Sequence, residues 1–486
     1  MKEWASAPDG SAAPVRSPAL RRAAAILDCV AAILFALALA VALFGGVRLF
    51  VNNTRLSATS PTRLFLILAV VVALRHVLSP RPSILSAARG ALDAVRASAS
   101  SATVAVVAPI WIATRLGVIV VAFIAVATIG LPPEVAQLRA SDNAFWNLPF
   151  RWDTGWYLGI AVDGYRWDPR DRGQQNIAFF PAYPLLMRGG GALLGARTDL
   201  PRTPNVQERL ATRTLAAGWA LALGASFAAL CALYRWASAV AGPRTAARAV
   251  ALCSAYPFAV YFSGAYTEPL FLLGTIGAFN AMRAQQTFAL AAWGLFIGLL
   301  RPNGFLVAVP LMWMAVAQGR RDWRLQAAAV MPCVGMLIFS AYLWTLTGRP
   351  LAWMEAHAAW GRTPPTWDAA VTQPLSQVVD SGMIGYAMSA PYQLMNGAAL
   401  LFACALVPAV WRRLGAAPVL LVAVTLGPPL IAGGLMSIGR LTATIFPLFV
   451  ALAAVLPRRY FQALLIAFAV GEGLAAVLFF TWRALV

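Results

Sequence analysis

Long apolar runs recur along this chain, and they constrain its fold more than any other feature. About thirteen runs carry few charges, and roughly 20 apolar residues are enough for one helix to cross a bilayer. Hydrophobic residues make up 60% of the chain and charged residues only 12%, about half the charged share of a soluble domain. We therefore predict an all-α polytopic membrane protein. The expected spans are 24–47, 63–79, 104–130, 210–234, 246–264, 267–282, 288–300, 303–318, 325–346, 391–411, 417–436, 441–456 and 460–482.

The basic residues predict how these spans are oriented. The formal net charge of +20 is compatible with nucleic-acid binding, but that function needs a clustered basic face. Here the arginines occur singly or in pairs in every second connection between runs, as the positive-inside rule expects for cytoplasmic loops. Thirteen spans with a cytoplasmic N-terminus and a non-cytoplasmic C-terminus satisfy this pattern throughout. We expect membrane lipids as partners and no nucleic acid.

Neither a signal peptide nor a metal site is expected. Residues 1–22 are rich in Pro, Ser and Ala and are predicted to be disordered, and the run that follows is too long for a signal peptide. Histidine occurs only as His76 and His357, and the five cysteines lie inside apolar runs without C-x-x-C spacing. The cysteines are interpreted as small buried residues, and no cofactor is expected.

Two long connections are predicted on the non-cytoplasmic side, at 131–209 and 347–390. Long loops in compact proteins are usually functional. An interfacial aromatic belt accounts for their tryptophans, and so do short amphipathic helices that lie on the membrane and wall a site. These interpretations are compatible. The tryptophans are Trp146, Trp152, Trp156 and Trp167 in the first connection and Trp353, Trp360 and Trp367 in the second.

Asp153 is the first candidate for chemistry. It lies between Trp152 and Trp156 in the first long connection. Partial desolvation among aromatic rings makes a carboxylate a better proton acceptor near neutral pH. Asp163 follows after nearly three helical turns and would project from a similar face. Alternatively, Asp153 caps a helix that begins at Thr154.

Further charged and polar residues are predicted at the outer ends of spans, on the same side as Asp153. Glu268 lies in GAYTEPLF, Arg301 and Asn303 lie in GLLRPNGF, and Arg440 lies in SIGRLTATIF. An ionised residue at the centre of a spanning helix costs on the order of 2.5–3.5 kcal/mol and is usually functional or paired. These residues are therefore candidates for one shared site.

Each of these charges also has a simpler explanation. An arginine near the end of a span can extend its guanidinium to the lipid headgroups, and Glu268 can pair with one of the arginines. Arg115 lies deeper inside a predicted span than the others, and we interpret it as structural.

Five blocks, in order, resemble the PIG-V-type mannosyltransferases. The first is RWDTGWYLGIAVDGY…NIAFFPAYPLLMR, which spans residues 151–188. The others lie at 255–273, 299–304, 348–362 and 437–449. The resemblance covers about residues 104–456, which we expect to be the catalytic membrane domain. Residues 1–22 would be a cytoplasmic tail, 23–103 two additional spans with a basic loop, and 457–486 the last span.

The resemblance implies a GT-C-like membrane glycosyltransferase with a catalytic acid in its first outer loop. That acid would be Asp153, acting as general base, and Arg301 and Arg440 would hold the donor phosphate. The donor would be a polyprenyl- or dolichyl-phosphate sugar, with mannose favoured, and transfer would invert the anomeric carbon. A glycan, glycolipid or protein would be the acceptor. Residues expected to bind substrate or support the site are Asp163, Tyr165, Glu268, Asn303, His357 and Trp156.

Two other classes of protein remain open. A lipid or sugar transporter or flippase would explain many spans with charges at their ends, but no internal repeat is visible. A non-catalytic membrane assembly subunit is the other alternative. For the enzyme, the expected location is the plasma membrane of a bacterium, which we favour, or the endoplasmic reticulum of a eukaryote.

Overall fold

The computed structural model describes residues 47–51, 54–58, 61–78, 101–135, 139–141, 143–197, 203–317, 322–362 and 372–483, with some positions between 26 and 38. The tail at 1–22 and most of the predicted span 24–47 lie outside these residues. The chain divides into two units, Met1–Asp93 and Ala94–Val486, and each is described by itself.

The first unit contains a helix and a small hairpin. Helix α2 (Pro61–Leu78) coincides closely with the predicted span 63–79. Strands β1 (Val47–Val51) and β2 (Thr54–Ala58) pair in antiparallel register, with Val47 opposite Ala58. The all-α prediction missed this hairpin. Its strands contain the β-branched residues Val47, Val51 and Thr54 and the aromatic Phe50, residue types that are enriched in strands.

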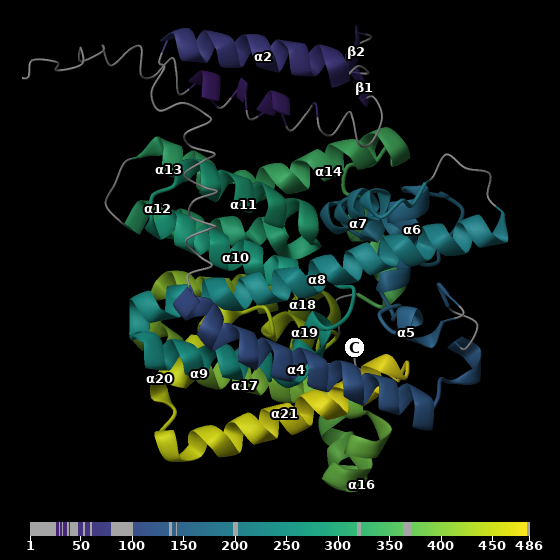
Figure 1. Ribbon diagram of the computed structural model, residues 1–486, viewed down its shortest axis with the longest axis vertical. Helices are drawn as coiled ribbons and strands as arrows, with labels where there is room; N and C mark the ends of the chain where they lie inside the picture. The colour runs from purple at the N-terminus through teal and green to yellow at the C-terminus, as the bar shows by residue number, and fades with distance from the viewer. Residues whose placement is uncertain are drawn as a thin grey trace, which may run out of the picture. The chain divides into compact units, whose positions relative to one another are not determined.

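The second unit is a bundle of helices (Figure 1). Among the described residues, five helices are long and apolar enough to cross a membrane, or six if a bent pair counts as one. They are α4 (Ser101–Thr128), α8 (Pro204–Ala241), α17 (Pro391–Leu414), α18 (Ala416–Gly433) and α21 (Arg458–Phe480). The multi-pass prediction is confirmed, whereas the number of thirteen spans stays a prediction.

Several predicted spans form two shorter helices each. Run 246–264 forms α9 (Pro243–Ser254) and the 3-10 helix η3 (Pro257–Phe262). Run 325–346 forms α13 (Trp323–Ala329) and α14 (Met331–Thr347), bent by 44°. Run 441–456 forms α20 (Phe446–Val455), preceded by α19 (Ile438–Thr442). Each second helix has a proline in its first turn, and proline lacks the N–H that a continuous helix needs.

The helices around the break at Arg301 pack very closely. Helix α10 (Glu268–Arg283) lies against α8 and α11 (Thr287–Leu300), and α11 lies against α14. Gly294 and Gly298 on α11 form a G-x-x-x-G pair that faces Pro332 of α14. A Cβ atom on Gly298 would overlap the backbone of Pro332, so only glycine permits this approach. Beyond α11 follow η4 (Pro302–Val307) and α12 (Ala308–Ala317).

The two long connections contain short helices. The first holds η1 (Pro133–Val135), α5 (Ala144–Asn147), α6 (Thr154–Asp163), η2 (Asn176–Ala178) and α7 (Ala182–Leu193). It ends earlier than predicted, because α8 begins at Pro204. The second holds α15 (Ala352–Ala356), η5 (His357–Trp360) and α16 (Gln373–Ser389).

Candidate active site

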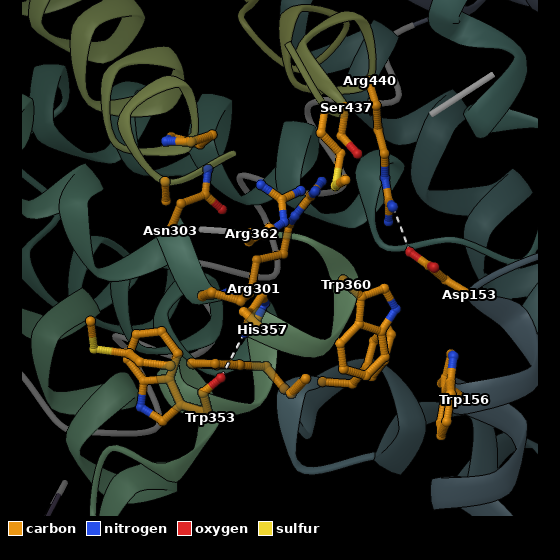
Figure 2. Close-up of a pocket in the computed structure, with 18 of the residues that line it drawn as sticks. Asp153, Trp156, Arg301, Asn303, Trp353, His357, Trp360, Arg362, Ser437 and Arg440 are labelled. Carbon is orange, nitrogen blue, oxygen red and sulfur yellow. Dashed lines mark hydrogen bonds and ion pairs between the residues drawn. The ribbon is translucent and has the colours of Figure 1, made fainter. Parts of the chain in front are cut away.

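A cavity of about 1120 Å³ lies in the second unit, lined by residues of α6, η4, η5, α18 and α19 (Figure 2). Its volume is above the roughly 300–1,000 Å³ usual for a pocket that holds one small molecule. Among the described residues, the charged lining consists of Asp153, Arg301, Arg362 and Arg440. Apolar lining residues include Phe305, Leu306, Met336, Leu351, Met354, Pro428, Pro429 and Ala432. The cavity therefore offers both cations and apolar surface.

Asp153 is positioned by the end of the last helix. Arg151 is 1% exposed, and its Nε donates to the carbonyl of Phe480 at 2.7 Å. Trp152 donates its indole N–H to the carbonyl of Phe479 at 3.2 Å. These carbonyls belong to the last turn of α21, where helix carbonyls lack intrahelical partners; that of Phe479 also accepts from the backbone N–H of Trp482 at 3.3 Å. The start of α6 is thereby fixed to the C-terminal end of α21.

The side chain of Asp153 does not cap α6, although the residue occupies the N-cap position. It makes no capping hydrogen bond, and its backbone N–H donates to the hydroxyl of Tyr266 at 3.1 Å. Its Oδ2 instead lies 2.5 Å from Nη1 of Arg440, and the side chain is 23% exposed. The carboxylate is thus directed at the cavity and remains accessible from it.

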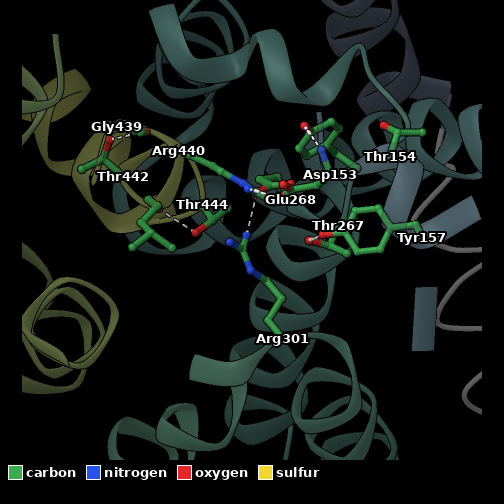
Figure 3. Close-up of polar contacts among 12 residues, drawn as sticks. Asp153, Thr154, Tyr157, Thr267, Glu268, Arg301, Gly439, Arg440, Thr442 and Thr444 are labelled. Atoms are coloured by element: carbon green, nitrogen blue, oxygen red, sulfur yellow. Dashed lines mark hydrogen bonds and ion pairs between the residues drawn. The ribbon is translucent and has the colours of Figure 1, made fainter. Parts of the chain in front are cut away.

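Glu268 bonds to two of the arginines, Arg301 and Arg440 (Figure 3). It is fully buried, at 0% exposure, in the first turn of α10. Its Oε1 accepts from Nη1 of Arg301 at 2.9 Å and also from Nε of Arg440. Arg440 further lies over the ring of Tyr266, at 4.9 Å from its centroid. The structure therefore brings Asp153, Glu268, Arg301 and Arg440 into one network.

The position of Arg301 follows from the proline after it. A residue before proline is disfavoured in the helical region and adopts extended backbone angles. Arg301 ends α11 with φ −149° and ψ 152°, and Pro302 begins η4. The break directs the guanidinium back toward Glu268 instead of continuing the helical surface.

Arg440 lies on the short helix α19, which depends on a glycine. The backbone N–H of Gly439 donates to Oδ1 of the buried Asn396 at 2.7 Å. A Cβ atom on Gly439 would overlap the ring of Phe258, which is itself 2% exposed. Only glycine therefore lets α19 approach η3 closely enough to place Arg440 in the cavity.

Replacing Gly439 by Ala is expected to destabilise the protein by about 1–3 kcal/mol, because overpacking forces α19 and η3 apart. Thermal unfolding in detergent measures the change. Gly473→Ala on α21 is the matched control, because nothing lies within 4 Å of its Cβ position. Equal stability of the two variants would contradict this explanation, whereas recovery in Gly439→Ala/Phe258→Leu would support it.

Backbone strain is concentrated around the cavity. Four non-glycine residues among those described have positive φ, and three of them line it: Trp152 at 51°, Ser437 at 64° and Trp482 at 59°. Such conformations cost of order 1–3 kcal/mol each and are commonest at functional sites. Trp152 directly precedes Asp153, and Ser437 begins α19. The strain thus occurs at the two segments that present the acid and Arg440.

His357 lines the cavity from η5. Its Nδ1 lies 2.6 Å from the carbonyl oxygen of Trp353, which can only accept, so Nδ1 carries the proton (Figure 2). In the neutral ring, Nε2 is then the hydrogen-bond acceptor. Burial lowers the pKa of His357 below its usual value, although the bond to Trp353 opposes this effect. A neutral imidazole at pH 7 follows.

We expect the stability of the protein to fall as the pH drops below about 6.5, the usual pKa of histidine. In that range the unfolded chain binds a proton at His357 and the folded protein does not, so acid favours unfolding. The loss stops once the pH falls below the lowered pKa. Thermal unfolding between pH 7.5 and 5 is the measurement, and His357→Gln should show a weaker dependence. An identical dependence in both proteins would contradict the assignment.

Aromatic side chains and one unpartnered amide complete the lining. Trp156 stacks on Phe179 with centroids 5.7 Å apart, and Trp360 meets Trp156 edge-on at 5.6 Å. Nδ2 of Asn303 is buried without a hydrogen-bond partner among the described residues. Flat aromatic faces and free polar groups suit a sugar, which has both C–H surfaces and hydroxyl groups.

Two predicted site residues lie elsewhere. Asp163 ends α6, about 15 Å from its start, and pairs with Arg166 at 3.7 Å. Tyr165 donates to the carbonyl of Phe179 at 2.7 Å and packs on Phe339. Neither lines the cavity. Their position favours a role in shaping the long connection.

Arg115 is held in a separate buried network. It pairs with Glu472 of α21 at 2.6 Å and donates to the carbonyls of Ala259 and Ser254, each at 2.6 Å. These bonds tie α4 to α21 and η3, as a structural role requires. Glu472 is an acid inside the last apolar run, and this position is the sequence signal that it pairs with a buried arginine. The sequence analysis did not predict this pair.

The sequence analysis did not predict several cavity residues, among them Arg362, Ser437 and Trp482. Arg362 is the last residue of the fourth block that resembles the family (348–362), close to His357, and this position is the sequence feature that points to it as a site residue. Among the described residues, no group of three or more His, Cys, Asp or Glu is arranged to hold a metal ion. Independence from metals stays a prediction.

The fold defines a multi-pass membrane protein, and its cavity combines three guanidiniums, one carboxylate and an apolar lining. The family model of mannosyltransferases (PIG-V) matches residues 118–346. The chain is thus similar to this family of glycosyltransferases, and the predicted resemblance is confirmed over a segment that includes Asp153, Glu268 and Arg301. No curated protein matches the chain.

Similar solved structures include an oligosaccharyltransferase from Archaeoglobus fulgidus in complex with Zn and sulfate. It has 16% identity and a TM-score of 0.39, with 76% of this chain and 53% of that chain covered. The archaeal oligosaccharyltransferase from the same organism, in complex with an inhibitory peptide and a dolichol-phosphate, has 16% identity and a TM-score of 0.39, with 76% and 56% covered. The chain spans about half the length of these proteins.

Proposed function

We propose that this protein transfers a sugar, mannose by its family resemblance, from a polyprenyl or dolichyl phosphate to a hydroxyl acceptor. One observation carries the proposal: a single cavity holds an accessible carboxylate, three guanidiniums and a broad apolar lining. The carboxylate can act as the base, the guanidiniums can bind a phosphate, and the apolar lining can contact a lipid chain.

The arginines suit the phosphate of the donor. A guanidinium is permanently charged and binds phosphate oxygens in a bidentate manner. Arg301 and Arg440 are oriented by Glu268, so their binding geometry is set before substrate arrives. The apolar residues of η4, α14 and α18 would contact the first isoprene units of the carrier.

The proposed reaction is a direct displacement. The acceptor oxygen attacks the anomeric carbon of the sugar, and its proton passes to Asp153. The bond between the anomeric carbon and the phosphate oxygen breaks at the same time, and its electrons stay with the polyprenyl phosphate. Attack opposite the leaving group inverts the anomeric carbon. The arginines stabilise the charge that develops on the leaving phosphate.

Arg440 links donor binding to the base. In the structure it bonds to Asp153 at 2.5 Å, so this carboxylate oxygen is occupied. A donor phosphate would compete for the same guanidinium. Its arrival would free the oxygen of Asp153 to accept a hydrogen bond from the acceptor hydroxyl.

The pattern of basic connections supports a reaction on the non-cytoplasmic side. It predicts a cytoplasmic N-terminus and puts the first long connection, with Asp153, on the opposite side of the membrane. The membrane would be the plasma membrane of a bacterium or the endoplasmic reticulum of a eukaryote. A glycan, glycolipid or protein would be the acceptor.

A transfer assay tests the proposal. The full chain in proteoliposomes is supplied with radiolabelled polyprenyl-phosphate mannose and with a membrane extract as the source of acceptors. Label should pass to an acceptor that mass spectrometry identifies as one hexose heavier. A nucleotide-diphosphate mannose serves as the comparison donor. Transfer only from the nucleotide sugar, or from neither donor, would overturn the proposal.

A further inference from the structure

Arg362 lines the cavity together with Arg301 and Arg440 (Figure 2). It follows η5 and packs against the end of α18, where a Cβ atom on Gly433 would lie 3.3 Å from Cγ of Arg362. The guanidinium therefore approaches the cavity from the second long connection, whereas the other two arginines come from breaks between helices.

The three arginines differ in their partners. Arg440 bonds to Asp153 and Glu268, and Arg301 bonds to Glu268. Among the residues that the structure describes, no carboxylate lies within ion-pair distance of Arg362, and its side chain has no hydrogen-bond partner. Arg362 is thus the guanidinium of the cavity that is available to an incoming anion.

The surroundings of Arg362 also favour an anion. Burial, and then the positive charges of Arg440 and Arg301, lower the pKa of Arg362 to about 10. The group still carries its charge at neutral pH. An anion placed among the three guanidiniums would relieve their mutual repulsion and replace the water lost by burial.

The charges of the network can be counted. Arg301, Arg362 and Arg440 contribute three positive charges, and Asp153 and Glu268 contribute two negative charges. The difference, three minus two, is one positive charge. A phosphodiester carries one negative charge and would neutralise the site, whereas a diphosphate carries more and would leave it negative.

We propose that Arg362 is the primary binding group for the donor phosphate, in a site matched to a singly charged phosphodiester. This inference rests on the proposed function and adds to it the residue that first binds the donor phosphate. Arg362 binds the phosphate first, and Arg440 joins it as the phosphate replaces Asp153.

Binding of polyprenyl phosphate, the product that keeps the phosphate of the donor as a monoester, tests the role of Arg362 without requiring turnover. The full chain in nanodiscs is titrated with polyprenyl phosphate while tryptophan fluorescence is followed, since Trp360 lines the same cavity. Arg362→Ala should weaken binding by at least about tenfold, the loss typical of one charged hydrogen bond. Arg362→Lys should recover part of it, because the charge returns without the bidentate fork.

Arg349→Ala is the matched control. Arg349 lies in the same connection, pairs with Glu355 at 2.7 Å and is 62% exposed, away from the cavity. Polyprenol, which lacks phosphate, tests the lipid contribution, and inorganic phosphate as competitor tests the anion alone. Wild-type affinity in Arg362→Ala, or an equal loss for polyprenol, would overturn the inference.

Transfer kinetics separate this inference from the proposed function. A raised donor KM in Arg362→Ala, with an unchanged acceptor KM, supports both. Normal transfer with a wild-type donor KM in Arg362→Ala would refute the role of Arg362 in phosphate binding and would not contradict the proposed function. Binding of polyprenyl phosphate that depends on Arg362, in a wild-type protein that transfers no sugar, would refute the function and leave the phosphate site.

Discussion

Replacing Asp153 by Asn is expected to lower the turnover of sugar transfer by roughly 10²–10⁴-fold, the usual contribution of a positioned general base. Asparagine keeps the size of the side chain but cannot accept the proton of the acceptor hydroxyl. Affinity for polyprenyl phosphate should not fall and should even rise. Arg440 would then have lost the carboxylate at 2.5 Å that competes with the phosphate.

Asp163→Asn provides the matched control, because Asp163 ends the same helix and lies outside the cavity. It should transfer sugar at close to the wild-type rate. Initial rates and binding are measured on the same preparations, after gel filtration has shown that each variant is folded. Near-normal turnover in Asp153→Asn would remove this residue from the role of base.

Replacing Glu268 by Gln is expected to destabilise the protein by about 3–5 kcal/mol, the range found when one partner of a buried ion pair is removed. Glu268 is completely buried and bonds to both Arg301 and Arg440, so its loss leaves two enclosed guanidiniums without their shared anion. Thermal unfolding in detergent measures the change, and sugar transfer should be lost with it.

Glu355→Gln is the control for this second variant. Glu355 also pairs with an arginine, but its side chain is 58% exposed. Exposed pairs contribute little, so its loss should leave the melting temperature nearly unchanged. A further test is the double variant Glu268→Gln/Arg301→Gln, which removes one orphaned charge and should recover stability. A melting temperature like that of wild type in Glu268→Gln would contradict the described network.

Hydropathy predicted the membrane fold because it shows which segments are solvated by lipid and not by water. Runs such as 460–482, which became α21, have no polar face that water could cover, so their length and position could be read directly. Hydropathy does not show whether an apolar run forms one continuous helix. The runs that contain Pro257, Pro332 and Pro447 are as apolar as the others, yet each is divided into two helices. Proline in the first turn of the second helix is the sequence signal of each break, and the length of an apolar run does not reveal it.

The charged part of the site could be predicted for a related reason. A charge in an apolar environment is costly, so Glu268 and Arg440 stood out against their neighbours. The ion-pair partner of each charged residue is decided by contacts between residues far apart in the chain, such as Asp153 and Arg440, whose residue numbers differ by 287. Arg362 lies in a polar connection where an arginine is unremarkable. Only the three-dimensional arrangement distinguishes it.

An experimental structure of the wild-type protein with polyprenyl phosphate bound tests the central claim most directly. We predict that the phosphate lies among the guanidiniums of Arg301, Arg362 and Arg440, with its free oxygen directed toward Asp153 and its isoprene chain along η4 and α18. A phosphate bound outside this cavity, or out of reach of the carboxylate of Asp153, would contradict the account.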